Sequence, residues 1–186
     1  MWLLDADAVV PEPAALAELL VVLAAPGDLP APALLTSRIL GADGALDPAG
    51  APAQPLLDRE VAIAAARRRV VAVRLARWGS LLVAREVLET LAAPREDFVP
   101  EVADLEWTSR VLREHPGYLV PRSVARGVLG HEPGRPDARE LRDRIRLVLR
   151  REAWVAQEPL WFAFLLAQEV GRELRTRPRG LWRGAG

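Results

Sequence analysis

The chain of 186 residues contains no cysteine, which excludes disulfide bonds, thiolate metal sites and a cysteine nucleophile. Lysine is absent as well, so all 25 basic residues are arginines, and 25 acidic residues balance them. A net charge of zero argues against a nucleic-acid-binding surface as the main function, so we expect no nucleic-acid partner. Without cysteine, the sequence gives no information on the redox compartment.

Long apolar runs are also missing, although apolar residues make up 51% of the chain. No run reaches the roughly 18 residues of a membrane span, and the N-terminus lacks the basic stretch of a secretory signal. The length suffices for one compact domain with a hydrophobic core. We therefore expect a soluble, cytoplasmic protein, with peripheral contact at the inner face of the cell membrane as an open alternative.

The first twenty residues carry the most informative pattern. Residues 2–4 form a short apolar segment, predicted to be a strand, that leads into two acids, Asp5 and Asp7. A turn is predicted at residues 9–11 and a helix over residues 12–20, because proline is tolerated at the start of a helix. Two carboxylates one residue apart form a cluster of hard oxygens that suits Mg²⁺ or Mn²⁺. Acid pairs also end many strands without binding a metal, and this alternative stays open.

A second group of polar residues lies in the segment FVPEVADLEWTSR, residues 98–110. An acid at a helix N-terminus is stabilised by the partial positive charge there, so Asp104 is either a helix cap or a functional acid. Glu106 and Arg110 are four residues apart and can pair on one face of a helix.

Four segments together resemble the family-two glycosyltransferases with the GT-A fold. WLLDADAVVPEPAAL resembles the family's DxD strand and the helix start after it, with Ala6 in place of the middle acid. RWGSLLV resembles the segment that lies under the donor sugar, residues 98–110 resemble the acid-bearing segment, and GYLVPRSV resembles a later strand. Their order matches the family over about residues 1–131. Within the family, the chain is most similar to actinobacterial galactofuranosyl- and rhamnosyltransferases.

This resemblance implies a hexosyltransferase that moves a sugar, with inversion, from a nucleotide-diphosphate donor to a cell-envelope glycan or a lipid-linked acceptor. Asp5 and Asp7 would hold Mg²⁺ or Mn²⁺ against the diphosphate, and Asp104 would accept the proton of the acceptor hydroxyl. Substrate-binding roles are implied for Trp78, Ser80, Glu106, Trp107 and Arg110. Two further positions depart from the family: Ala103 replaces an acid, and Gly127 stands where a histidine completes the metal site.

The resemblance also implies an α/β fold with part of a GT-A-like mixed sheet and flanking helices over residues 1–131. A helical C-terminal extension is expected over residues 132–186. The family's nucleotide-binding half precedes the DxD strand, so the chain resembles the C-terminal two-thirds of such an enzyme. The rival hypothesis is a non-catalytic remnant or one half of a split enzyme, acting as a binding or assembly module. An open sheet edge beside residues 2–4 would favour that rival.

The remaining elements follow from periodicity and turn residues. Strands are predicted over residues 34–40, 70–73 and 118–121, and helices over residues 59–66, 85–91 and 137–154. Proline at position 121 is expected to end its strand. The arginines at positions 67–69 either meet phosphate or an anionic membrane surface, or are simply solvated. The arginine-rich helix over residues 137–154 leaves the same choice between membrane contact and ordinary packing.

Overall fold

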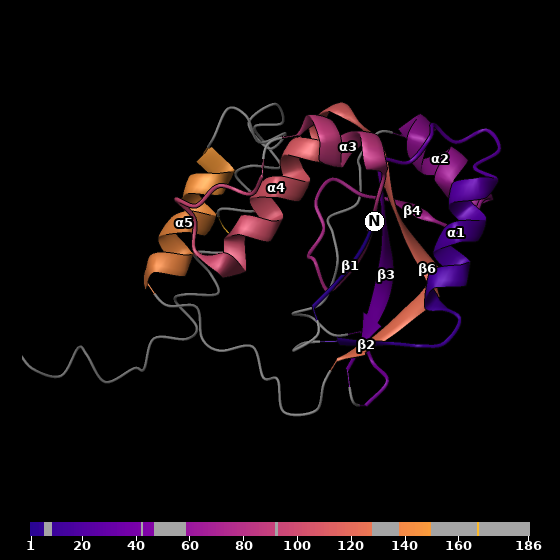
Figure 1. Ribbon diagram of the computed structural model, residues 1–186, viewed down its shortest axis with the longest axis horizontal. Helices are drawn as coiled ribbons and strands as arrows, with labels where there is room; N and C mark the ends of the chain where they lie inside the picture. The colour runs from indigo at the N-terminus through magenta and orange to yellow at the C-terminus, as the bar shows by residue number, and fades with distance from the viewer. Residues whose placement is uncertain are drawn as a thin grey trace, which may run out of the picture. The chain divides into compact units, whose positions relative to one another are not determined.

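The computed structural model describes residues 1–5, 9–41, 43–46, 59–91, 93–127 and 138–149, together with Ala167. The chain divides into two compact units, Met1–Pro133 and Gly134–Gly186, and each is described by itself. The first unit is a mixed α/β unit with helices packed on a mixed sheet (Figure 1). In the second unit, residues 138–149 form α5 (Ala138–Leu149), with an ion pair between Glu140 and Arg144 one turn apart.

The sheet contains six strands from the described residues: β1 (Trp2–Leu4), β2 (Val9–Pro11), β3 (Leu34–Leu40), β4 (Val71–Ala72), β5 (Ser80–Val83) and β6 (Gly117–Gly127). Their order is β1-β5-β3-β6-β2, and β4 pairs with β6 as well. β3 and β6 are parallel, whereas the other pairs are antiparallel. β1 is an edge strand, because none of the described strands pairs with the side of β1 that faces away from β5.

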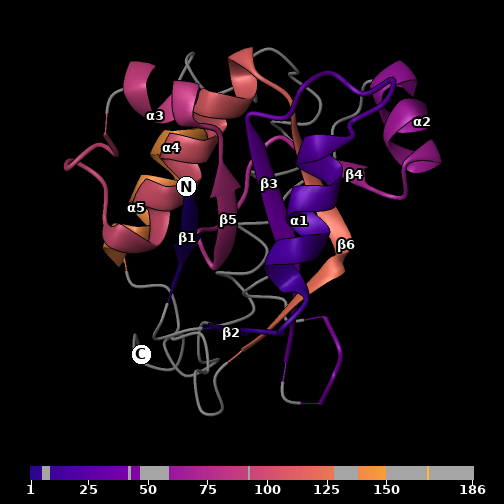
Figure 2. The same ribbon diagram turned by 45° about the vertical axis from the view of Figure 1, so that its right-hand side comes forward.

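Helices cover both faces of the sheet, as the two views in Figures 1 and 2 show. α1 (Ala15–Ala24) and α2 (Arg59–Arg67) lie on one face, and α3 (Arg85–Thr90) and α4 (Pro100–Glu114) lie on the other. Successive side chains of a strand point to opposite faces, so each strand contributes to two cores. Leu35 and Leu82 accordingly belong to the core under α1 and α2, and their neighbours Leu34 and Leu81 to the core under α3 and α4.

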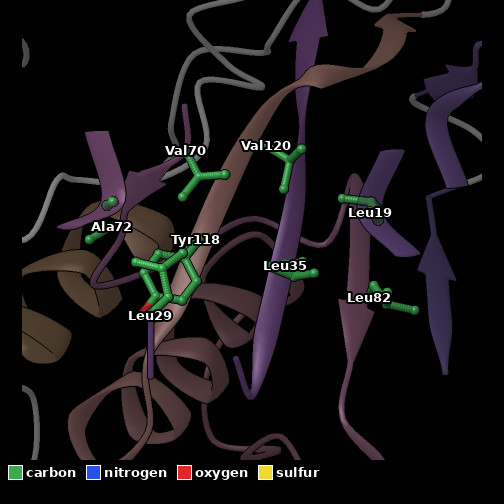
Figure 3. Packing of buried hydrophobic residues seen from close by; sticks show 9 residues of the cluster. Leu19, Leu29, Leu35, Val70, Ala72, Leu82, Tyr118 and Val120 are labelled. Carbon is green, nitrogen blue, oxygen red and sulfur yellow. The ribbon is translucent and has the colours of Figure 1, made fainter. Parts of the chain in front are cut away.

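The core under α1 and α2 is built around Tyr118 of β6 (Figure 3). The ring of Tyr118 is fully buried, and its hydroxyl donates a hydrogen bond of 3.3 Å to the carbonyl oxygen of Pro30. Leu19 of α1 and Ala65 of α2 close this core from outside. Each helix therefore buries one stripe on the sheet and leaves its opposite side outward.

Most of the elements predicted from the sequence are confirmed. The strands over residues 2–4 and 34–40 are present as expected, and the helices predicted over residues 59–66 and 85–91 are α2 and α3 within one residue at their ends. A turn follows β3, with Gly44 at a φ of 78°.

Two predictions are wrong for one shared reason. Pro121 does not end a strand, and residues 9–11 are not a turn but β2. The register between β3 and β6 shifts here, since Val120 pairs with Ser37 whereas Val124 pairs with Arg38. Proline lacks an N–H group, and a bulge leaves its position outside the ladder. β6 therefore continues to Gly127 and provides the edge on which β2 forms.

Within the described part of the chain, no helix has both the length and the apolarity that crossing a membrane requires.

Candidate functional site

Asp5 follows β1 directly, and its side chain is exposed. Its backbone N–H donates a hydrogen bond of 3.2 Å to the carbonyl oxygen of Gly79, just before β5. Its own carbonyl oxygen accepts the N–H of Val9 at 2.9 Å, which fixes the start of β2 next to the end of β1. Asp7, the second predicted metal ligand, lies outside the described residues.

Asp104 lies in the second turn of α4, not at its N-terminus. The helix begins at Pro100 with Val99 as its N-cap residue, so the interpretation of Asp104 as a helix cap is wrong. The Oδ2 atom of Asp104 accepts the backbone N–H of Trp78 at 3.3 Å, and Oδ1 accepts the N–H of Leu105 at 2.6 Å. The half-buried carboxylate therefore holds the segment that leads into β5.

Trp78 and Gly79 are consecutive, and each contacts a different predicted acid. Trp78 donates its N–H to Asp104, and Gly79 accepts the N–H of Asp5. Two motifs that are far apart in the sequence thus meet at one short segment, at the end of the sheet where β1 ends and β5 begins. Sequence reasoning did not identify the backbone of Gly79 as part of this site, because a backbone contact leaves no trace in the side-chain pattern.

Ser80 is fully buried and belongs to a chain of hydrogen bonds across the sheet. Its Oγ accepts Nε1–H of Trp2 at 3.2 Å, and it lies 2.7 Å from Oγ of Ser37. Ser37 lies 2.7 Å from Oγ of Ser123, which donates to the carbonyl oxygen of Ala15 at 2.8 Å.

The direction of this chain follows from counting protons. A carbonyl oxygen can only accept, so the single hydroxyl proton of Ser123 is used on Ala15. Ser37 must then donate to Ser123, and Ser80 must donate to Ser37. The hydroxyl of Ser80, predicted to bind substrate, thus uses its proton inside the sheet and also accepts from Trp2. Ser37, a serine inside the apolar strand over residues 34–40, was the available signal for such a network.

Trp78 and Trp107 form an edge-to-face pair, with ring centroids 5.8 Å apart and ring planes at 88°. Trp107 is only 4% exposed and belongs to the core under α3 and α4, whereas Trp78 is half-buried. Of the two predicted sugar-binding rings, Trp78 therefore lies closer to solvent. Such pairs prefer this geometry because the positive ring edge meets the negative ring face.

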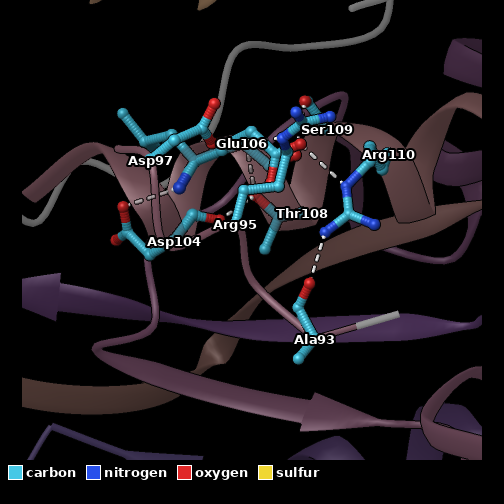
Figure 4. Close-up of polar contacts among 9 residues, drawn as sticks. Ala93, Arg95, Asp97, Asp104, Glu106, Thr108, Ser109 and Arg110 are labelled. Carbon is cyan, nitrogen blue, oxygen red and sulfur yellow. Dashed lines mark hydrogen bonds and ion pairs between the residues drawn. The ribbon is translucent and has the colours of Figure 1, made fainter. Parts of the chain in front are cut away.

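Glu106 and Arg110 form the predicted i, i+4 ion pair, with Oε1 of Glu106 2.8 Å from Nε of Arg110. Arg110 also donates from Nη2 to the carbonyl oxygen of Ala93 at 2.9 Å (Figure 4). Glu106 is 2% exposed, and its Oε2 atom has no hydrogen-bond partner among the described residues. The pair thus fixes the segment after α3 against α4, the helix that also carries Trp107.

The position expected for a metal-binding histidine is Gly127, the last residue of β6. Gly127 pairs with Val9, so it lies beside the strand that follows Asp5. The nearest histidine in the sequence, His131, is four residues further along and lies outside the described residues. Among the residues that the structure describes, no group of three or more His, Cys, Asp or Glu side chains could hold a metal ion. The exposed carboxylate of Asp5 is a hard oxygen donor that fits Mg²⁺ or Mn²⁺, with water and phosphate oxygens as further ligands.

Comparisons of the chain with models of protein families, with curated proteins and with solved structures found no match. The residues and their geometry are therefore the basis for assigning a function.

Proposed function

We propose that the chain takes part in metal-dependent glycosyl transfer from a nucleotide-diphosphate sugar. The observation that supports this proposal is the meeting of Asp5 and Asp104 at the Trp78–Gly79 segment. Sugar transfer needs an acid cluster for the diphosphate and a separate base for the acceptor hydroxyl. In this proposal, the exposed Asp5 belongs to the acid cluster and the half-buried Asp104 is the base.

In the proposed reaction, the acceptor hydroxyl oxygen attacks the anomeric carbon of the donor sugar. The bond from this carbon to the diphosphate oxygen breaks, and its electron pair leaves with the nucleoside diphosphate. Asp104 accepts the proton of the attacking hydroxyl, so no covalent glycosyl–enzyme forms. A divalent cation held by Asp5 and Asp7 would supply charge neutralisation for the leaving diphosphate. In this proposal, the acceptor is a cell-envelope glycan or a lipid-linked sugar, because the resemblance of the motifs implies such an acceptor.

The role of Trp78 in this proposal is to present its ring to the sugar. Its half-buried ring is held at a fixed angle by Trp107, and its backbone N–H orients the carboxylate of Asp104. Ser80, Glu106, Trp107 and Arg110 act as support in this proposal, because their polar groups or rings lie inside the unit. A rigid support of this kind keeps reacting groups within the narrow range of geometry that transfer requires.

A second candidate function is that of an assembly module, and the edge position of β1 favours it. Met1 and Val83 exchange two hydrogen bonds, of 2.7 and 2.8 Å. Hydrogen-bonded and non-hydrogen-bonded pairs alternate along antiparallel strands, so the backbone groups of Trp2 and Leu4 point away from β5. An edge of this kind is a template for a strand of another polypeptide.

The two candidates are separated by calorimetric titration of the chain with Mn²⁺ and a panel of nucleotide-diphosphate sugars, followed by a transfer assay. We expect one donor to bind only when Mn²⁺ is present, and Asp5→Asn and Asp7→Asn to abolish this binding. Asp104→Asn should keep donor binding but lower turnover by about 100-fold or more, since a positioned base contributes on this order.

The matched control is Glu89→Gln, which removes an exposed carboxylate of α3 that pairs only with Arg85 in the contacts described here. This variant should bind donor and metal like the unmodified chain. Absence of metal-dependent binding for every donor would reject a stand-alone glycosyltransferase and leave the assembly module as the remaining candidate.

A further inference from the structure

The outward sides of α1 and α2 form a surface that the proposed function does not use. α1 has the sequence ALAELLVVLA, with Glu18 as its one charged residue. Glu18 contacts Arg122 of β6 at 3.3 Å and so points toward the sheet side of the helix. No charged side chain is left for the outward side of α1, which is unusual for a helix that faces water.

Three large apolar residues of α1 are exposed on this side. Leu20, Val21 and Leu23 expose 44%, 63% and 40% of their surface, whereas Leu19 is completely buried in the core. α2 adds one exposed large apolar residue, Ile63 at 45%, next to the exposed charged residues Arg59 and Glu60 of its first turn, whereas Ala65 is buried. We name this set of exposed residues on the two helices the α1–α2 surface. Leu20 and Leu23 are three residues apart and are therefore neighbours on the surface of α1.

Arginines border the α1–α2 surface at one end. Arg67, Arg68 and Arg69 lie at the end of α2 and are all exposed. Nε of Arg68 lies 3.4 Å from Oδ1 of Asp28, in the turn that follows α1, so the basic cluster is next to the C-terminal end of α1. Both ribbon views show α2 beside this end of α1, on the face of the sheet away from α3 and α4 (Figures 1 and 2). Apolar residues and a basic border thus occur on one surface.

We propose that the α1–α2 surface binds the surface of an anionic phospholipid bilayer. Leu20, Val21 and Ile63 would enter the boundary between headgroups and acyl chains, where apolar side chains of interfacial helices lie. The arginines would bind lipid phosphates, to which the guanidinium group offers several donors at once. This binding is independent of the proposed glycosyl transfer, because none of these residues contacts Asp5, Trp78 or Asp104 in the contacts described.

A lipid surface fits these residues better than a second copy of the chain. A dimer through this surface would bring a second arginine cluster into the same interface, which adds like-charge repulsion. α1 is also only about 15 Å long, and its outward stripe is small compared with the roughly 800 Å² per partner of a stable protein interface. A bilayer accepts a small apolar stripe and supplies the opposite charge.

The test is co-sedimentation of the full chain with vesicles, either of phosphatidylcholine alone or of phosphatidylcholine with an equal amount of phosphatidylglycerol. We expect binding to the anionic vesicles and little binding to the neutral ones. Raising the ionic strength should weaken the binding, because salt screens the arginines. Val21→Glu should lower the affinity about tenfold or more, because it places a negative charge in the apolar stripe.

Val10→Glu is the matched control. Val10 of β2 is 60% exposed, against 63% for Val21, and it belongs to a different surface. This control should bind anionic vesicles like the unmodified chain. The double variant Arg67→Gln and Arg69→Asn should lose the preference for anionic lipid, and asparagine suits position 69 because Arg69 has a φ of 57°.

Four results would overturn the proposal. The first is absence of binding to anionic vesicles, and the second is binding that Val21→Glu and Val10→Glu weaken equally. The third is a dimer that Val21→Glu converts to a monomer in light scattering, which would make a second copy the occupant. The fourth is a large loss of thermal stability in both Val21→Glu and the milder Val21→Ser, which would mean that the chain itself covers this surface.

Discussion

The backbone N–H of Trp78 donates a hydrogen bond to Oδ2 of Asp104, 3.3 Å away, and this bond joins α4 to the segment before β5. The next residue, Gly79, accepts the N–H of Asp5. Replacing Asp104 therefore has two separable effects, one on the segment and one on any chemistry of the carboxylate.

Asp104→Ala should destabilise the fold by about 1–2 kcal/mol, because it leaves the N–H of Trp78 without its acceptor. Asp104→Asn should destabilise the fold less than Asp104→Ala, because its amide oxygen can still accept the N–H of Trp78, although its NH₂ group replaces the oxygen that accepts the N–H of Leu105. Urea denaturation of both variants measures the difference. Equal stability of the two variants would mean that the bond to Trp78 carries no net stabilisation.

The buried serine chain gives a prediction on stability that is independent of function. Ser37→Ala removes the middle hydroxyl, so Ser80 loses its acceptor and Ser123 loses its donor. We expect a loss of about 1–3 kcal/mol in the free energy of unfolding, the usual effect of leaving buried polar groups unpaired.

Ser109→Ala is the matched control for Ser37→Ala, because Ser109 is buried as well but donates only to the carbonyl of Glu106, one turn earlier in α4. Alanine has the higher helix propensity, so this change should cost little. If the two variants were equally stable, the hydroxyl chain would not contribute to the stability of the sheet.

The buried hydroxyl of Tyr118 should lower the stability of the fold at alkaline pH. Burial raises the pKa of its hydroxyl above the ordinary value of about 10. As the pH rises past that value, the unfolded chain releases the proton first, so the folded state binds more protons and the free energy of unfolding falls. The contribution is fully present below about pH 10 and is lost as the pH rises through the raised pKa of the folded state.

Tyr118 is the single tyrosine of the chain, so the near-ultraviolet absorbance of phenolate reports on this residue alone. Phenolate should form only at a pH above the ordinary range, together with unfolding. Tyr118→Phe should remove this part of the pH dependence, at a cost of about 1 kcal/mol for the lost bond to Pro30. Phenolate at an ordinary pKa in the folded protein would contradict the prediction.

The sequence allowed prediction of the elements that depend on local signals. The apolar run over residues 34–40 predicted β3, and the i, i+4 spacing predicted the pair of Glu106 and Arg110. Pro100 also indicates where α4 begins, but the sequence analysis did not use it. Proline is favoured at the first position of a helix, so it marks the start of α4 and places Asp104 one turn further in.

Features that depend on distant partners could not be predicted. Val9–Pro11 forms a strand only because β6 continues past the irregularity at Pro121, which three local residues do not reveal. Ser80 likewise looks like an ordinary polar residue, and only the meeting of β5, β3 and β6 shows that its hydroxyl is enclosed. The contact between Gly79 and Asp5 could not be predicted either, because it is a backbone hydrogen bond that does not depend on the side chains.

Gly127 offers a way to test the candidate metal site by adding a ligand. Gly127 pairs with Val9, beside the end of β1 where Asp5 lies. Gly127→His introduces an imidazole, a ligand that binds Mn²⁺ together with carboxylates. If Asp5 and Asp7 form a metal site, the affinity of the chain for Mn²⁺ should rise by about tenfold or more, the scale on which one coordinating group changes metal affinity.

Titration of Mn²⁺ by electron paramagnetic resonance measures this gain directly, because bound and free ions give different signals. The double variant with Asp5→Asn should lose the gain, since the histidine alone is a weak site. Falling pH should remove it as well, because the imidazole must be neutral to bind the metal. A gain in affinity that persists in the Asp5→Asn background would show that the new histidine binds the ion without the carboxylate of Asp5. Position 127 would then not belong to the same metal site as Asp5 and Asp7.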